Sequence, residues 1–115
     1  MARDTPLPQL RRFTYAEAKA LMPEVRRLTA AAHAAAEALQ AELLAQPGDA
    51  QLRERLEAEV RAWAEGVAAL GLEVKGLWLV DFDSGSGYYC WRWPEANLEF
   101  YHSYEEGFSG RVRIH

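Results

Sequence analysis

The sequence predicts an α+β fold in which a long N-terminal antiparallel helical hairpin precedes a three-stranded antiparallel β-meander. Apolar residues recur at spacings of three and four up to Leu70, and they alternate with polar residues after Gly71. The first period is typical of an amphipathic helix and the second of a half-buried strand. The 115 residues fit one domain, divided into a hairpin at 14–70, a meander at 76–103 and a tail at 104–115.

The first predicted helix begins at Thr14. This threonine and Glu17 have the spacing of a capping box, in which each side chain accepts a backbone N–H of the other residue. The apolar stripe continues to Pro47 and consists of Leu21, Val25, Leu28, Ala32, Ala35, Leu39 and Leu43. Pro23 lacks a backbone N–H, so we expect a kink there that turns segment 13–22 over the sheet.

The second predicted helix is capped by Asp49 and ends at Gly71, which can adopt the left-handed conformation that closes a helix. Its stripe consists of Leu52, Leu56, Val60, Trp63, Val67 and Leu70. The alanine-rich run 30–36 has two interpretations, namely high helix propensity or a close coiled-coil contact that could form a dimer face. His33 in this run is expected to be solvated.

Three strands are predicted at 76–83, 88–93 and 98–103, because two segments rich in turn-forming residues separate them. A four-residue loop at 84–87 favours a first hairpin with Val80 and Phe82 beside Trp91. Asp81 then lies on the opposite face, together with Cys90.

The second hairpin has a predicted register that bears on metal binding. A four-residue loop at 94–97 would pair Arg92 with Glu99, bringing opposite charges together, and would pair Tyr89 with His102. Cys90 and His102 would then point to opposite faces and could not share an ion. The sequence therefore predicts no metal site. No cofactor is expected either, and Cys90 is expected to be structural, as a small apolar residue in a sheet without a cationic neighbour.

Composition excludes several classes of partner and location. The net charge is −4 and no segment is strongly basic, which argues against nucleic acid and membrane partners. No signal segment or long apolar run is found, and one cysteine cannot form an internal disulfide, so we expect a cytoplasmic protein. Eleven arginines against two lysines, with abundant alanine, indicate a GC-rich bacterial genome and are compatible with a thermophilic source.

Candidate site residues lie in the C-terminal half, where ten of the thirteen aromatic residues fall between Trp78 and Phe108. As catalytic candidates, His102 would act as a base that Glu105 or Asp81 orients. As binding candidates, Arg111 would clamp an anion beside His102 and Trp91. Arg111 could instead form a structural ion pair, with Glu105 or Asp81 as its expected partner.

Several short motifs occur in a fixed order along the chain. They are Phe13-Thr14-x-x-Glu17-Ala18, Leu21-Met22-Pro23, Leu79-Val80-Asp81-Phe82, Tyr89-Cys90-Trp91, and Tyr101-His102 with Glu105, Gly107-Phe108 and Gly110-Arg111. Over residues 13–111 the chain thus resembles the bacterial domain-of-unknown-function family numbered 2203. The resemblance implies no assigned activity. It implies four polar family positions, which are Asp81, His102, Glu105 and Arg111.

Three functional hypotheses follow. The favoured one is a non-enzymatic interaction module that forms a homodimer through its helices or binds another helical protein. The alternative is a small-molecule or anion-binding site, or a hydrolytic one, built on His102, Glu105, Asp81 and Arg111, so enzymatic activity is left open. A third, stacking of single-stranded nucleic acid on Trp91, Trp93 and Tyr101, is opposed by the negative charge.

Overall fold

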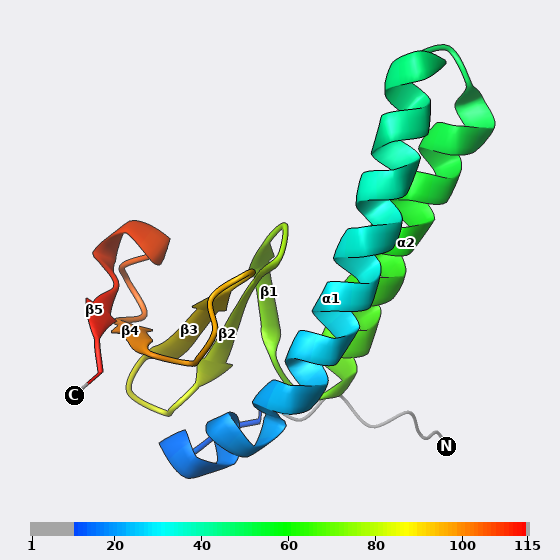
Figure 1. Ribbon diagram of the computed structural model, residues 1–115. Coiled ribbons are helices and arrows are strands. Elements are labelled where there is room, and N and C mark those ends of the chain that lie inside the picture. Colours follow the sequence, from blue (N-terminus) through cyan, green and yellow to red (C-terminus); the bar gives the residue numbers. More distant parts are fainter. Residues whose placement is uncertain (1–10, 115) are drawn as a thin grey trace, which may run out of the picture.

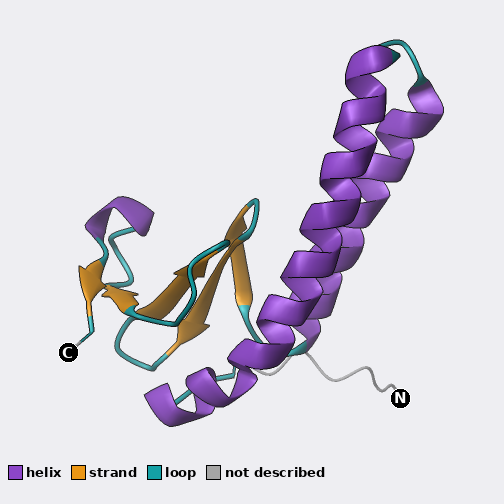
Figure 2. Cartoon of the chain, in the orientation of Figure 1, coloured by secondary structure: helices purple, strands orange, loops and turns teal. Residues whose placement is uncertain are grey.

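The computed structural model describes residues 11–114, in which a helical hairpin leads into an antiparallel sheet (Figures 1 and 2). The predicted domain of residues 1–115 also includes positions 1–10 and 115, which lie outside the described residues. The elements are α1 (Tyr15–Ala45), α2 (Ala50–Ala69), β1 (Glu73–Gly76), β2 (Leu79–Asp83), β3 (Tyr88–Arg92), β4 (Phe100–His102), the short 3-10 helix η1 (Phe108–Gly110) and β5 (Val112–Arg113). Among the described residues, no helix combines the length and apolarity needed to cross a membrane.

The predicted helix caps are confirmed. Thr14 and Glu17 form the capping box of α1, with Glu17 N donating to Thr14 Oγ1 at 3.1 Å and Thr14 N donating to Glu17 Oε1 at 2.9 Å. The carboxylate of Asp49 accepts two backbone N–H groups at the start of α2, and Gly71 follows α2 with a φ of 96°. Pro23 lies inside α1, and the kink expected there stays a prediction.

The two helices are joined by one buried hydrogen-bond chain. Thr29 Oγ1 donates to Val25 O at 2.7 Å and accepts Trp63 Nε1–H at 2.8 Å. Both side chains are buried, so the bond satisfies the indole N–H inside the core. It also ties α2 to α1 at the level of the sheet.

The sheet has five antiparallel strands in the order β1-β2-β3-β4-β5, so the predicted count of three is wrong. The predicted strand 76–83 is divided by a turn at Leu77-Trp78, with β1 before it and β2 after it. Trp78 adopts a φ of 61° in this turn, a conformation that a tryptophan in a β-like sequence does not predict. β5 has two residues, too few for a periodic signal.

The first hairpin has the favoured register, with Asp81 opposite Cys90 and Val80 opposite Trp91. The second does not, because Tyr88 rather than Tyr89 lies opposite His102. The connection from β3 to β4 is longer than a four-residue loop and folds around Glu95, which accepts Arg92 N–H through Oε1 and Trp91 Nε1–H through its carbonyl.

The charge pairing that favoured the wrong register is also absent. Glu99 forms its ion pair with Arg113 of β5 and not with Arg92. Glu99 has its partner on β5, a strand too short to be predicted from periodicity, and with only two strands to pair, Arg92 was the one opposite charge at hand. The one-residue shift brings Cys90 and His102 to the same face of the sheet.

The two faces of the sheet have different coverings. One face packs on α1 and α2 and forms the apolar core, which includes Phe13, Ala18, Met22, Val25, Trp63, Val67, Val80, Phe82, Trp91 and Leu98. Segment 13–22 therefore lies over the sheet as predicted. His33 was expected to be solvated, but it is half-buried, with its ring 5.5 Å from Trp78 and 5.4 Å from Trp93. The opposite face carries polar side chains.

Candidate functional site

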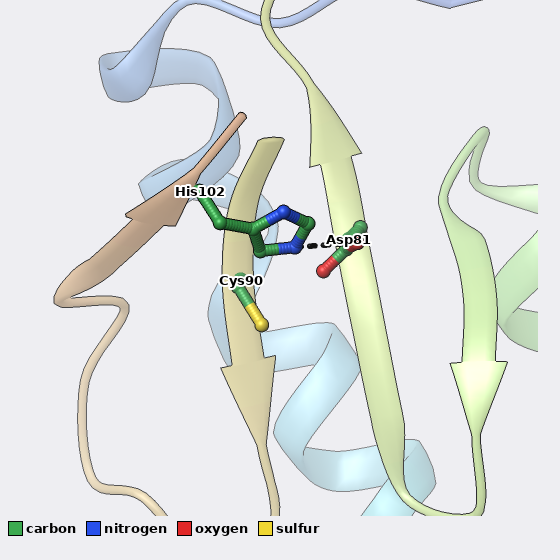
Figure 3. Close-up of side chains that lie close together, drawn as sticks. All are labelled: Asp81, Cys90 and His102. Carbon is green, nitrogen blue, oxygen red and sulfur yellow. Dashed lines mark hydrogen bonds and ion pairs between the residues drawn. The ribbon is translucent and has the colours of Figure 1, made fainter. Parts of the chain in front are cut away.

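Three side chains of different chemistry meet on the sheet face opposite the helices. Asp81 comes from β2, Cys90 from β3 and His102 from β4, and their side chains project toward one another (Figure 3). A carboxylate oxygen, the sulfur and a ring nitrogen lie within 4.8 Å of one another, and all three residues are buried. The prediction that Cys90 and His102 point to opposite faces is wrong, and with it the argument that excluded a shared ion.

The backbone determines the tautomer of His102. Its Nδ1 lies 2.8 Å from the carbonyl oxygen of Ser103, and a carbonyl only accepts, so Nδ1 carries a proton. In a neutral imidazole Nε2 then has a lone pair, and Nε2 lies 2.9 Å from Asp81 Oδ2. Two acceptors at this distance repel each other unless a proton or a cation lies between them. A histidine that binds a metal through Nε2 typically donates its Nδ1–H to a backbone carbonyl, as His102 does to Ser103.

Asp81 has a second oxygen without a partner. Among the described residues no group has hydrogen-bond geometry to Oδ1, although this atom is buried; the Cys90 thiol is close enough to the carboxylate to oppose the rise in its pKa. An unpartnered buried carboxylate oxygen is unfavourable, and such atoms are rare in folded proteins. Burial raises the pKa of Asp81 above its ordinary value, against the opposing effects of Cys90 and His102.

Cys90 is held as a thiol in this environment. Burial and the negative charge of Asp81 raise its pKa to about 12. A thiol with so high a pKa is a poor nucleophile at neutral pH, because the thiolate is the reactive form. The Cys90 thiol is therefore poorly suited to act as a nucleophile at neutral pH.

A hollow of about 400 Å³ opens over the three residues. Its walls come from β1, β2, β3 and the tail, and include Lys75, Leu79, Tyr88, Tyr104, Glu105 and Phe108. Glu105 is exposed at this hollow, and its carboxylate is not among the atoms of the buried group. Of the two residues expected to orient His102, Asp81 contacts its ring at Nε2, and Glu105 does not belong to the buried group.

Arg111 lies close enough to Cys90 to oppose the rise in the pKa of that thiol, and its guanidinium is paired with the loop before β4. Its guanidinium bonds the carboxylate of Glu95 and lies 4.0 Å from the ring centroids of both Phe100 and Phe108. The predicted partners, Glu105 and Asp81, are therefore wrong. Arg111 attaches the tail to the sheet. Through its contact with Phe108 it also positions the side of the hollow that Phe108 forms.

Comparison with known protein families identifies the family of this chain. The family model described as uncharacterized conserved protein (DUF2203) matches residues 11–114. The chain belongs to this family. Searches of curated proteins and of solved structures gave no match. Of the four polar residues that the resemblance implied, the structure of this DUF2203 member brings Asp81 and His102 into one cluster with Cys90, whereas Glu105 and Arg111 are not among its donor atoms.

Sequence reasoning missed two contributors to the DUF2203 site and misplaced a third. Cys90 was predicted to be structural because it is a small apolar residue in a sheet, and the wrong register kept it apart from His102. Its pairing with Asp81 in the first hairpin was a usable signal. The role of Glu95 had no signal in the sequence, since Arg111 lies 16 residues away. Trp91, a predicted binding residue, is fully buried in the core and donates to Glu95 O, so it does not line the hollow.

Proposed function

We propose that this protein binds a transition metal ion of the zinc class through Asp81, Cys90 and His102. One observation carries the proposal, namely the buried and unpartnered Oδ1 of Asp81 beside a thiol and an imidazole. Thiolate, imidazole and carboxylate together are a donor set typical of zinc and not of magnesium or calcium.

The distances and charges support this function. In a tetrahedral zinc site the ligand atoms lie about 3.3–3.6 Å apart, given bond lengths of about 2.0–2.3 Å. The three donor atoms are within 4.8 Å, so side-chain shifts of about 1 Å suffice. One divalent ion would neutralise a thiolate and a carboxylate, which removes the unfavourable burial of charge at Asp81.

Cobalt substitution tests the proposal, because a cobalt–thiolate bond produces a charge-transfer band. We expect the wild-type protein to bind one Co²⁺ per chain with this band and to lose the ion to added Zn²⁺. Cys90→Ser should abolish the band, and His102→Gln should weaken binding by at least tenfold. His33→Gln is the matched control and should bind as the wild type does. Absence of the band, together with an unchanged melting temperature in Zn²⁺, would refute the function.

A second function, formation of a homodimer through the helices, is favoured by an independent observation. The distal part of the hairpin projects away from the sheet (Figure 1), and the stripe residues Leu56 and Val60 of α2 are only half-buried. Together with Ala36, Leu77 and Trp78 they line a second hollow of about 300 Å³. A second hairpin laid along this surface would bury the apolar side chains that the monomer leaves open.

A further inference from the structure

We infer that the metal site keeps one coordination position for a small monovalent anion, which enters from the hollow and is attracted by Lys75. This inference rests on the proposed metal function. The metal centre would thus bind a second, exchangeable ligand in addition to its three protein ligands.

The first support is the number of protein ligands. Within residues 11–114, the group of neighbouring donor atoms contains three residues and no fourth histidine, cysteine or carboxylate. Structural zinc sites are closed by four protein ligands, whereas sites that act on a ligand use three and leave one position open. Glu105 also lines the hollow, yet its exposed carboxylate lies outside the group.

The second support is the space above the three residues. The hollow of about 400 Å³ is bordered by Asp81, Cys90 and His102 themselves, so an ion held by them would face it. A water molecule occupies about 30 Å³, and the hollow therefore accepts a ligand several times larger. Leu79 and Phe108 provide apolar contacts beside the open position.

The third support is the distribution of charge. With a divalent ion bound to one thiolate and one carboxylate the centre is neutral, and the surrounding charges then select the ligand. Among residues 11–114 and His102 aside, Lys75 is the only basic residue that lines the hollow. Its ammonium lies 3.1 Å from Glu73 Oε1, and its charge acts on Asp81 at the floor. Outside the lining, the charge of Arg111 acts on Cys90. Glu105 and Glu106 also line the hollow and would repel polyvalent anions, which restricts the class to small monovalent anions such as azide or a simple carboxylate.

The test is a titration of the Co²⁺-loaded protein with azide, followed in the visible absorption of the metal. We expect a saturable spectral change, and no such change with sulfate. Lys75→Gln should weaken azide binding roughly threefold to tenfold, as expected for one partly exposed charge. Lys19→Gln removes the only other lysine of the chain, which lies on α1 over the ring of Tyr15, and should leave azide binding unchanged.

Glu105→Gln separates the open site from a closed one. If Glu105 were the fourth ligand, this variant would alter the cobalt spectrum before azide is added, and the wild-type protein would not respond to azide. Either result overturns the inference, as does an azide affinity that Lys75→Gln leaves unchanged. Cobalt binding with the thiolate band but without an azide response would refute the inference and retain the proposed function. Loss of cobalt binding itself would refute both.

Discussion

Arg111 and Glu95 form a bidentate ion pair, with Nη1···Oε1 and Nη2···Oε2 distances of 3.0 and 2.7 Å. The side chains are only 11% and 25% exposed, so solvent screens the pair weakly. The pair joins the tail to the loop between β3 and β4. Through this contact the end of the chain holds one wall of the hollow over Asp81.

Replacing Arg111 should therefore destabilise the fold. We expect Arg111→Ala to lower the free energy of unfolding by about 3 kcal/mol, because the carboxylate of Glu95 would remain partly buried without its partner. The control is Arg113→Ala, which breaks a pair with Glu99 whose side chains are 58% and 44% exposed and should have an effect of about 1 kcal/mol or less. Denaturant unfolding measures both values. Equal effects of the two variants would contradict the prediction.

Asp81→Asn should separate stability from metal binding. Burial raises the pKa of Asp81 above its ordinary value of 3.8. The stability that the protonated Asp81 contributes is therefore fully present below pH 3.8, and it is lost as the pH rises through the pKa of the folded state. The asparagine amide is uncharged and can still donate to His102 Nε2. We expect an equal or higher melting temperature at neutral pH, with no stabilisation by Zn²⁺.

The matched control for that variant is Asp83→Asn, which removes a carboxylate from the same face of β2. It should keep the response of the melting temperature to Zn²⁺. Thermal melts of the three proteins, with and without the ion, provide the comparison. A Zn²⁺ response retained by Asp81→Asn would remove Asp81 from the ligand set.

Thr29→Val tests the buried hydrogen bond between the helices. Valine has nearly the same shape as threonine but cannot accept Trp63 Nε1–H, which would remain buried without a partner. The expected loss is about 1–3 kcal/mol of unfolding free energy. Trp63→Phe in the Thr29→Val background removes the unpaired donor as well, so a double-mutant cycle should show coupling between the two positions. Additive effects would argue against the bond.

Cys90 should react slowly with thiol reagents in the metal-free native protein. Its pKa of about 12 leaves almost no thiolate at neutral pH, and the side chain is buried. We expect stoichiometric alkylation by iodoacetamide only after denaturation, followed by mass spectrometry. Rapid alkylation of the native protein would show that the thiol is accessible and ionised.

A dimer through the helices should scatter light with twice the mass of the 13.0 kDa chain. Val60→Glu places a charge on the half-buried surface of α2 and should shift the mass to that of a monomer with little change in melting temperature. Leu39→Glu places a charge at a buried position of α1 and should instead unfold the hairpin. A monomeric wild-type protein at micromolar concentration would exclude this dimer.

Helix boundaries were predictable because their signals are local. The capping box at Thr14 and the cap at Asp49 each satisfy N–H groups within three residues, so a short window of sequence contains the whole interaction. The first β-hairpin was predictable for the same reason, because the short loop 84–87 fixes which residues of β2 and β3 lie opposite each other. The register of the second hairpin depends on Glu95 and on β5, which pairs with β4, and no local pattern contains both.

Local patterns along the chain were sufficient to predict the helical hairpin, the antiparallel sheet that follows it, the family and the candidate polar residues. Which of these residues meet depends on tertiary contacts. A one-residue change of register reverses the face to which a side chain points, and this change moved Cys90 beside His102 while Arg111 paired with Glu95. The register of two strands depends on the total free energy of loop, strand and tail contacts that lie far apart in the sequence. Helix formation depends on interactions within a few turns, so it can be predicted locally.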